Sequence, residues 1–333
     1  MRKSSRSLLI LLLLAAAAVG YYFLRQRRER EPAPAPVTGQ LVVHFLDVGQ
    51  GDSELIRLPS GGTILIDTGA RGAPTVEMLK RLGVGDIDLV IATHPHEDHI
   101  GEMVDVMRAF KVKEVWDPGF AYPTRTYLNM LKEIDSQNIK FENPKRGHTR
   151  AFGDVTLEVL HPGATFISED RDDANDASMV VRLTFGNKRF LFTGDAEEAS
   201  WRQMIDANKS SLRADLLKAA HHGSDDGTTG NVLDAVRPEI VTISCAIGND
   251  YHHPHHRVVR LLEERRSQIK PYRTDLQGTI TATSDGNSIQ MSTERTVTQD
   301  RLYLTGDEAA GKVASDDSGR GGATRKRAAK GSR

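Results

Sequence analysis

The stretch THPHEDH, residues 93–99, places four metal-binding side chains within six residues, directly after an apolar run that is typical of a buried strand. His94 and His96, separated by one residue at the end of a strand, can direct both imidazoles at one cation, and Asp98 with His99 can reach a second cation. Nitrogen and carboxylate ligands of this kind suit Zn²⁺, with Mn²⁺ or Fe as alternatives. We therefore favour a metal site over an incidental surface cluster of histidines.

Strand-like and helix-like apolar patterns alternate along most of the chain on both sides of this stretch. Runs typical of strands lie at 41–47, 53–58, 63–67, 87–93, 155–160, 179–185, 189–193, 212–219, 240–244 and 278–283. Helical patterns lie at 74–82, 197–207, 232–236 and 255–264. Tight glycine turns join the early strands, and β-α alternation follows them. This order indicates one mixed α/β domain, for which we expect the bounds 40–295.

Seven motifs follow one another in order between residues 41 and 286. They are DVGQGD (47–52), LIDTG (65–69), THPHEDHIG (93–101), TGD (193–195), HHGS (221–224), NDYHHP (249–254) and RTD (273–275). The third motif resembles the HxHxDH signature of the metallo-β-lactamase superfamily. The whole set resembles the hydrolase domain at the C-terminus of ComEC-type DNA-uptake proteins. The resemblance implies a four-layer αββα sandwich, one or two divalent metal ions, and nuclease or phosphodiesterase activity.

The resemblance implies a set of metal ligands, and the chemistry of these side chains also suits metal-dependent hydrolysis. These ligands are His94, His96, Asp98, His99, Asp195 and His221. Asp195 follows a strand-like run and can bridge two cations about 4 Å apart. His221 and His222 compete for the last position, and we favour His221 because it directly follows the strand, where metal ligands are common. A metal-bound hydroxide would then be the nucleophile, since bound water loses its proton near neutral pH.

Other residues in the motifs are candidates for catalysis or for support of the ligands. Asp98 can orient the attacking water as well as coordinate a metal. His222 and His253 can hold a substrate oxygen or protonate the leaving group. Asp67 is expected to hydrogen-bond a ligand imidazole. The residues expected to support the ligands or contact the substrate are Asp47, Asp52, Asp67, Asn175, Ser178 and Ser224.

Three features depart from the family pattern or imitate it. Many superfamily members supply a further histidine upstream of the bridging aspartate, but residues 172–178 contain none, so the number of metal ions stays open. Asn175 and Ser178 stand in that stretch, as they do in ComEC-type sequences. His252 occupies the glycine position of the NxYGHP motif and is expected to narrow the mouth of the pocket. Residues 305–307 repeat the TGD triplet, which we interpret as coincidental because no helix is expected after it.

The formal net charge of −1 conceals an uneven distribution of charge. Residues 1–31 carry +5, residues 318–333 carry +6, and the body between them carries −12. A protein that binds long nucleic acid usually presents a basic face, so the acidic body disfavours DNA although the family suggests it. A smaller phosphodiester-containing substrate needs no basic groove. Cys245 is the only cysteine, so no disulfide partner is expected.

The N-terminal region has the pattern of a membrane anchor. A short basic head, 1–6, precedes the uncharged run 7–24, which at about 1.5 Å per residue is just long enough to cross a hydrocarbon core of about 30 Å. A basic and Pro/Ala-rich linker, 25–39, follows, and residues 296–333 are expected to form a disordered tail that is basic at its end. We therefore expect a single-pass protein of the bacterial cell membrane with its body outside the cytoplasm. A cleaved signal peptide followed by secretion is the alternative.

Taken together, these features favour a membrane-anchored metal-dependent hydrolase that acts on a phosphodiester bond. The same chemistry permits hydrolysis of an acyl, lactone or lactam bond. A hypothesis of another class is a non-catalytic binding or assembly module at the cell envelope. Such a module would be expected to have lost ligands, whereas every expected ligand is present in the sequence.

Overall fold

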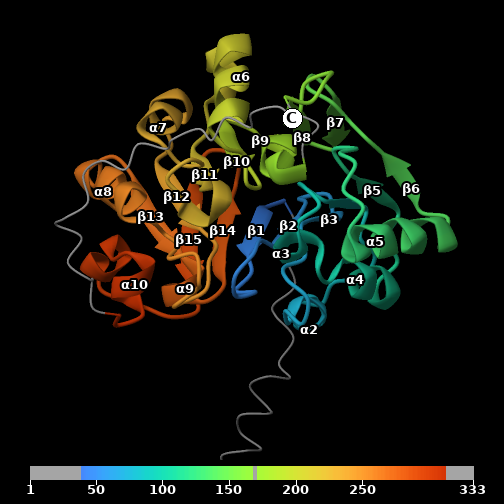
Figure 1. Ribbon diagram of the computed structural model, residues 1–333, viewed down its shortest axis with the longest axis horizontal. Coiled ribbons are helices and arrows are strands. Elements are labelled where there is room, and N and C mark those ends of the chain that lie inside the picture. The colour runs from blue at the N-terminus through green and yellow to red at the C-terminus, as the bar shows by residue number, and fades with distance from the viewer. Residues whose placement is uncertain (1–38, 168–170, 313–333) are drawn as a thin grey trace, which may run out of the picture.

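Two β-sheets face each other in the computed structural model, which describes residues 39–167 and 171–312. Helices cover the outer face of each sheet, so the chain forms four layers in the order helices, sheet, sheet, helices (Figure 1). This arrangement confirms the predicted αββα sandwich. The predicted head 1–6, the anchor 7–24 and nearly all of the linker lie outside the described residues. Within the described ranges, no helix is long and apolar enough to cross a membrane.

The first sheet has eight strands in the order β15-β14-β1-β2-β3-β4-β5-β6. They are β1 (Leu41–Phe45), β2 (Glu54–Arg57), β3 (Thr63–Ile66), β4 (Leu89–Ile91), β5 (Glu114–Trp116), β6 (Lys140–Glu142), β14 (Ile280–Ser284) and β15 (Ile289–Thr293). Neighbours from β3 to β6 pair in parallel, and the other neighbours are antiparallel. β3 and β4 are buried on both faces, which explains their continuous apolar runs in the sequence.

The second sheet has seven strands in the order β13-β12-β11-β10-β9-β8-β7. They are β7 (Thr149–Phe152), β8 (Val155–His161), β9 (Val180–Phe185), β10 (Lys188–Phe192), β11 (Leu216–Lys218), β12 (Ile240–Ile243) and β13 (Lys270–Arg273). Neighbours from β10 to β13 pair in parallel. Because the carboxyl ends of parallel strands open at one edge of a sheet, the loops after β10, β11 and β12 leave the sheet side by side.

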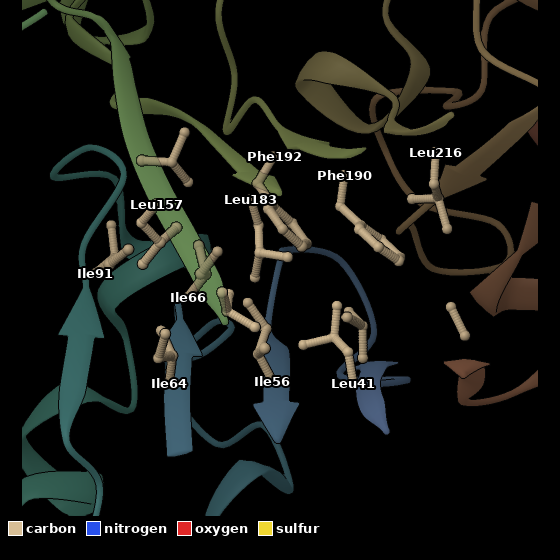
Figure 2. Close-up of a cluster of buried hydrophobic side chains, with 14 of the residues drawn as sticks. Leu41, Ile56, Ile64, Ile66, Ile91, Leu157, Leu183, Phe190, Phe192 and Leu216 are labelled. Carbon is tan, nitrogen blue, oxygen red and sulfur yellow. The ribbon is translucent and has the colours of Figure 1, made fainter. Parts of the chain in front are cut away.

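Three apolar cores hold the layers together. Figure 2 shows the central core, where Ile56 and Ile64 of the first sheet face Leu183 and Phe190 of the second. The outer core of the first sheet packs beneath α2 (Thr75–Arg81), α4 (Met103–Ala109) and α5 (Arg125–Ser136). The outer core of the second sheet packs beneath α6 (Glu198–Asn208), α7 (Gly230–Val236) and α8 (His256–Glu264). Removal of this apolar surface from water is the main force that holds the sandwich closed.

Short helical turns connect these larger elements. They are α3 (Glu97–Ile100), α9 (Thr274–Gln277), α10 (Gly306–Ala309), and the 3-10 helices η1 (Arg171–Ala177), η2 (Lys209–Leu212), η3 (Ala220–Gly223) and η4 (Gln299–Tyr303). α3 contains part of the THPHEDH stretch, and η3 contains most of the HHGS motif. Two of the seven motifs therefore lie on single turns directly after strands, where their side chains can face a common pocket.

Residues 103–152 contain five elements that the apolar pattern does not predict, namely α4, α5, β5, β6 and β7. The three strands have only three or four residues each, which is too short for a reliable period. α5 does carry a helical signal, because Tyr127, Met130 and Ile134 lie on one face and are buried. The expected strand 212–219 is also shorter than predicted, since η2 occupies its beginning and only β11 is extended.

The expectation of a disordered tail from residue 296 is wrong for its first part. η4 and α10 lie within residues 299–309, and Leu302 and Ala309 are buried against Leu276 of α9. A helix does follow the triplet at 305–307, and the Thr305 side chain caps it. The reason is tertiary contact, because three buried apolar side chains, Leu302, Tyr303 and Ala309, suffice to dock so short a segment but create no recognisable period. Residues 313–333 lie outside the described ranges.

Candidate metal centre

The predicted ligands meet at one edge of the sandwich, on loops and turns that follow strands. β4 leads to His94 and His96, α3 carries Asp98 and His99, β10 leads to Asp195, and η3 carries His221 and His222. A pocket of about 610 Å³ opens over them. It is lined by Gln50, Ala70, His96, Glu97, Asp98, Asn175, Asp195, His221, His222, Tyr251 and His253. The side chains at the centre of this edge therefore pack against the interior of the sandwich and face solvent on the side of the pocket.

Asp98, His99, Asp195 and His222 form a compact group, with one ligand atom of each within 4.8 Å of all the others. His222 Nε2 lies 3.2 Å from Asp98 Oδ2 and 3.5 Å from Asp195 Oδ2, and His99 Nε2 lies 3.2 Å from Asp195 Oδ2. Ligand atoms about 2.0 to 2.1 Å from a tetrahedral Zn²⁺ would be about 3.3 Å apart. The group therefore has the donor types and the spacing of a divalent cation site.

His94 and His96 form a second donor pair beside this group. His94 Nε2 lies 3.1 Å from His96 Nδ1 and 3.9 Å from Asp195 Oδ2. Two imidazole nitrogens this close can face one cation, as the sequence predicts, and the Asp195 carboxylate lies within reach of both sets. No histidine from residues 172–178 is available to complete the pair. The pair is consequently the less complete of the two sites.

The two adjacent histidines take different places in the structure, and His221 Nε2 stays 3.9 Å from Asp195 Oδ2. The buried His222 joins the compact group, whereas His221 Nδ1 lies 3.3 Å from both Glu197 Oε1 and Asp226 Oδ1. Both histidines have positive φ, 51° and 53°, so the chain turns sharply after the strand and aims the second imidazole inward. Being first after the strand therefore does not decide which residue faces the ligands.

Carboxylate and carbonyl oxygens orient the two inner imidazoles. His99 Nδ1 donates to Asp67 Oδ2 at 2.7 Å, which is the expected hydrogen bond between Asp67 and a ligand imidazole. Asp67 also accepts from the Thr93 amide at 2.8 Å and the Thr93 hydroxyl at 2.6 Å. His222 Nδ1 donates to the Ser244 carbonyl oxygen at 2.9 Å. With Nδ1 engaged in each ring, Nε2 is left to face the ligand group.

A buried ion pair lies beneath the site. The Lys218 ammonium contacts the Asp52 carboxylate, and both side chains are 1% exposed. Asp52 Oδ1 is 3.3 Å from His222 Nδ1, so the pair supports the same imidazole. Asp52 is among the residues predicted from its motif, whereas Lys218 lies in an apolar run and is not predicted. A lysine inside a buried strand is itself the signal, because such a charge is rarely buried without a partner.

Unsatisfied atoms and pKa directions both indicate that this group fits a cation. The buried atoms His99 Nε2 and Asp195 Oδ1 have no hydrogen-bond partner among the described residues, which is costly for polar groups out of water. Burial disfavours the His222 imidazolium, yet the carboxylates of Asp195 and Asp52 raise the pKa of His222 to about 9. The surrounding carboxylates thus favour positive charge at this point, and a divalent cation would supply it.

The remaining predicted residues lie at different distances from the centre. The Ser178 hydroxyl accepts a hydrogen bond from the Asp195 amide at 3.1 Å, and Asn175 lines the pocket and donates to Glu197 at 2.7 Å. Ser224 is buried directly after η3 and hydrogen-bonds Asp226. Asp47 is not among the pocket residues, and its carboxylate pairs with Arg295 at 3.2 Å instead.

His253 and His252 face opposite sides of the loop that carries them. His253 lines the pocket, where burial and the neighbouring histidines lower its pKa to about 3. Its neutral imidazole can therefore hydrogen-bond a ligand in the pocket. His252 does not line the pocket, and its Nδ1 instead lies 2.9 Å from Asp307 Oδ1. The expectation that His252 narrows the pocket mouth is consequently wrong, because the ring turns toward α10.

Comparison with known proteins agrees with this geometry. Residues 46–246 match the family model described as Metallo-beta-lactamase superfamily. The chain is 31% identical over 258 residues to ComE operon protein 3 of Bacillus subtilis, a match that covers 72% of this chain and 32% of that protein. It is 28% identical over 238 residues to Recombination protein 2 of Haemophilus influenzae, covering 68% and 27% of the two chains. The chain therefore spans about a third, or less, of the length of these ComEC-type relatives.

Among solved structures, the chain is similar to Igni18, a metallo hydrolase from the hyperthermophilic archaeon Ignicoccus hospitalis. The two share 16% sequence identity with a TM-score of 0.49, over 72% of this chain and 98% of that chain.

Proposed function

This chain belongs to the metallo-β-lactamase superfamily of metal-dependent hydrolases, and from that membership we propose that it hydrolyses a phosphodiester bond at the edge where its ligand groups converge. The observation that supports the proposal most directly is the position of Asp195 between two donor sets. One set is Asp98, His99 and His222, and the other is His94 with His96. Two cation positions that share a carboxylate suit a phosphoryl group, whose attacking and leaving oxygens both need charge stabilisation.

The chain's own residues would hold the cation and place the reactants. Asp98, His99, Asp195 and His222 are the ligands that we propose for Zn²⁺, with Mn²⁺ as the alternative metal. A divalent ion bound there supplies positive charge for a phosphoryl oxygen and lowers the pKa of a coordinated water. The Asp98 carboxylate, whose side chain is 30% exposed, faces the pocket and can orient the attacking water by accepting a hydrogen bond from it.

His253 and His221 would contact the substrate from the same side of the pocket, since their rings lie edge to face with centroids 5.4 Å apart. The neutral His253 imidazole can donate to or accept from a substrate oxygen. His221, paired with Glu197 and Asp226, can place its ring beside a phosphoryl oxygen without occupying a ligand position. This role for His221 replaces the ligand role that the sequence favours.

The charge of the chain favours a smaller phosphodiester over a long duplex. Residues 32–317 carry −12, and a long duplex would bring many phosphates close to that charge. The names of the relatives, ComE operon protein 3 and Recombination protein 2, are consistent with a nucleic-acid context for those proteins. We therefore propose a short nucleic-acid fragment or another small phosphodiester as the substrate of this chain.

Membrane attachment forms the second part of the proposal. The uncharged run 7–24, behind the basic head 1–6, would hold the body at the bacterial cell membrane through the Pro/Ala-rich linker. Expression of the full chain and of residues 38–333, followed by membrane sedimentation, tests this. The full chain should pellet with the membranes and resist extraction with high salt. A soluble full chain of unchanged mass would contradict an anchor.

The activity test compares bond classes on one preparation. The full chain would be loaded with Zn²⁺ or Mn²⁺ and assayed on bis-(p-nitrophenyl) phosphate, a short single-stranded oligonucleotide, a lactone and a lactam. We expect turnover of the two phosphodiesters that is lost in His222→Ala and retained in His256→Ala, which removes an exposed histidine outside the pocket. Turnover of only the lactone or lactam would identify the alternative bond class. Metal binding without any turnover would favour a non-catalytic module.

A further inference from the structure

The backbone of His252 has a conformation that usually requires glycine. Its φ is +63°, in the left-handed region, and the corresponding position of the family motif is the glycine of NxYGHP. A histidine there is strained unless contacts elsewhere compensate. Its ring finds such a contact at Asp307, with Nδ1 2.9 Å from Oδ1 and 2.8 Å from Oδ2. The departure from the motif and the docked α10 are therefore physically connected.

α10 also contacts the backbone of the same loop directly. The Gly306 amide donates to the Pro254 carbonyl oxygen at 3.1 Å. A Cβ on Gly306 would lie 2.1 Å from the His253 carbonyl oxygen and 2.9 Å from that of His252. Only glycine allows so close an approach. The first turn of α10 therefore rests on residues 252–254 and leaves them little freedom to move.

The other side of this C-terminal segment, residues 299–312, is fixed to the second sheet. The guanidinium of Arg273, at the end of β13, donates to the Leu304 carbonyl oxygen and pairs with Asp275 at 2.7 Å. Leu302 and Ala309 pack against α9, beside which α10 lies in red in Figure 1. Thr305 and Glu308 complete a capping box within α10. The segment is thus a support attached to buried elements.

The supported loop forms one wall of the pocket. Tyr251 and His253 both line it, and their rings stack with centroids 5.8 Å apart and an interplanar angle of 17°. The Asn249 side chain organises the loop by accepting from the amides of Tyr251 and His253, at 3.1 and 2.9 Å. A shift of residues 252–254 would therefore displace two side chains that face the substrate.

We propose that Gly306 and Asp307 are positioning residues that lock the 249–255 loop, and so set the place of Tyr251 and His253 in the pocket. Gly306 fixes the loop through its backbone, and Asp307 fixes it through the His252 ring. The consequence for substrate binding rests on the proposed function, whereas the consequence for loop mobility does not. Because the His252–Asp307 pair is exposed, at 61% and 34%, it contributes little to global stability. Its effect should be local to the loop.

The test compares two substitutions in the same short helix of the metal-loaded full chain. Asp307→Asn breaks the pair with His252, whereas Glu308→Gln weakens the capping box without touching the loop. Hydrogen–deuterium exchange of peptides that cover 249–255 should become faster in Asp307→Asn and stay unchanged in Glu308→Gln. Equally faster exchange in both variants would show that the segment only stabilises its surroundings and would contradict the positioning role. Unchanged exchange in Asp307→Asn would also overturn the proposal.

Kinetics on bis-(p-nitrophenyl) phosphate give the second measurement. Asp307→Asn should raise KM about two- to fivefold, the size expected from loss of its exposed ion pairs with His252 and Lys312, with kcat and bound metal unchanged. Gly306→Ala should raise KM by about tenfold or more because the segment must move away from the loop. In a His252→Gly background, Asp307→Asn should have no further effect.

If exchange changes as expected but no variant or parent turns over substrate, the proposed function fails and the positioning role stands. If KM and exchange stay at parental values, the role fails alone.

Discussion

Asp195 and Asp117 are both buried carboxylates that follow a strand, yet the groups around them differ in charge. Asp195 lies after β10 and Asp117 directly after β5, with exposed fractions of 2% and 1%. Burial alone raises the pKa of an aspartate. At Asp195, burial is outweighed by the imidazoles of His222, His99 and His94, and the pKa lies well below its usual range.

At Asp117, burial outweighs the hydrogen bonds that favour ionisation, and the pKa rises to about 6. Its hydrogen bonds come from neutral donors, the Gly119 amide at 2.6 Å, the Tyr127 hydroxyl at 3.1 Å and the Asn143 amide at 3.3 Å, and the charge of Lys145 is too weak to offset burial. Neutral donors hold a carboxylate in place but supply no charge that could keep it ionised. Burial by itself therefore does not mark a functional acid in this protein. The marker is a buried acid among imidazoles, together with buried polar atoms that lack a partner, here His99 Nε2 and Asp195 Oδ1.

The largest expected effect comes from Asp195→Asn, because this substitution removes the carboxylate within reach of both donor sets. Turnover of a phosphodiester should fall by about a thousandfold or more, with loss of bound metal. The matched substitution Asp117→Asn should leave kcat within about twofold, since its hydrogen-bond donors Gly119, Tyr127 and Asn143 do not line the pocket. Metal content measured by emission spectroscopy, together with kcat, checks both. Similar losses of kcat and bound metal in both variants would contradict the prediction that only the carboxylate surrounded by imidazoles is functional.

The next effect separates the two adjacent histidines. His222→Ala should lose bound metal and lower kcat by about a hundredfold or more, because it removes a member of the compact group. His221→Ala should keep its metal and mainly raise KM, by about tenfold, through loss of a group on the pocket wall. Metal titration of both variants, with circular dichroism as a folding control, decides the assignment. The reverse pattern would restore the ligand assignment favoured by the sequence.

A smaller effect is expected when the support of a ligand is removed and the ligand itself stays. Asp67→Asn weakens the hydrogen bond that fixes the His99 ring, and metal affinity should fall by about 10- to 100-fold. Thr93→Ser keeps the hydroxyl that donates to Asp67 and should change affinity by no more than about twofold. Competition with a metal-binding dye measures both constants. An unchanged affinity in Asp67→Asn would show that packing alone orients the ring.

The smallest effect is on stability and concerns Asp117 alone. Its folded-state pKa of about 6 exceeds the unfolded value of 3.8, so between these pH values the folded chain keeps a proton that the unfolded chain has lost. The free energy of unfolding should therefore fall by about 2 kcal/mol as pH rises through this window. Urea unfolding of the parent and Asp117→Asn at pH 4 and pH 7 isolates the term. The free energy of unfolding of Asp117→Asn, relative to that of the parent, should be higher at pH 7 than at pH 4.

A constant difference between the two chains at both pH values would contradict this assignment. Other titrating groups affect both chains alike and cancel in the comparison.

The sequence alone predicts the donor types and the fold because both are encoded locally. Four ligands in THPHEDH directly follow an apolar run, and the two buried parallel strands β3 and β4 appear as continuous apolar segments. The alternation of apolar patterns predicts a mixed α/β domain, and the resemblance of the motifs to the metallo-β-lactamase superfamily implies the sandwich. The tie between Asp67 and a ligand imidazole is also expected from the sequence, and the structure contains that hydrogen bond to His99.

Tertiary structure alone decides which of two neighbouring residues faces the site and which distant segments support it. His221 and His222 are chemically identical and adjacent, so only the left-handed turn after β11 selects between them. Lys218 becomes a partner of Asp52 because β11 and the loop after β1 meet in space. The docking of residues 299–312 rests on a glycine contact and a few buried side chains. Local periodicity reports what each segment prefers, whereas long-range packing fixes the direction in which each side chain finally points.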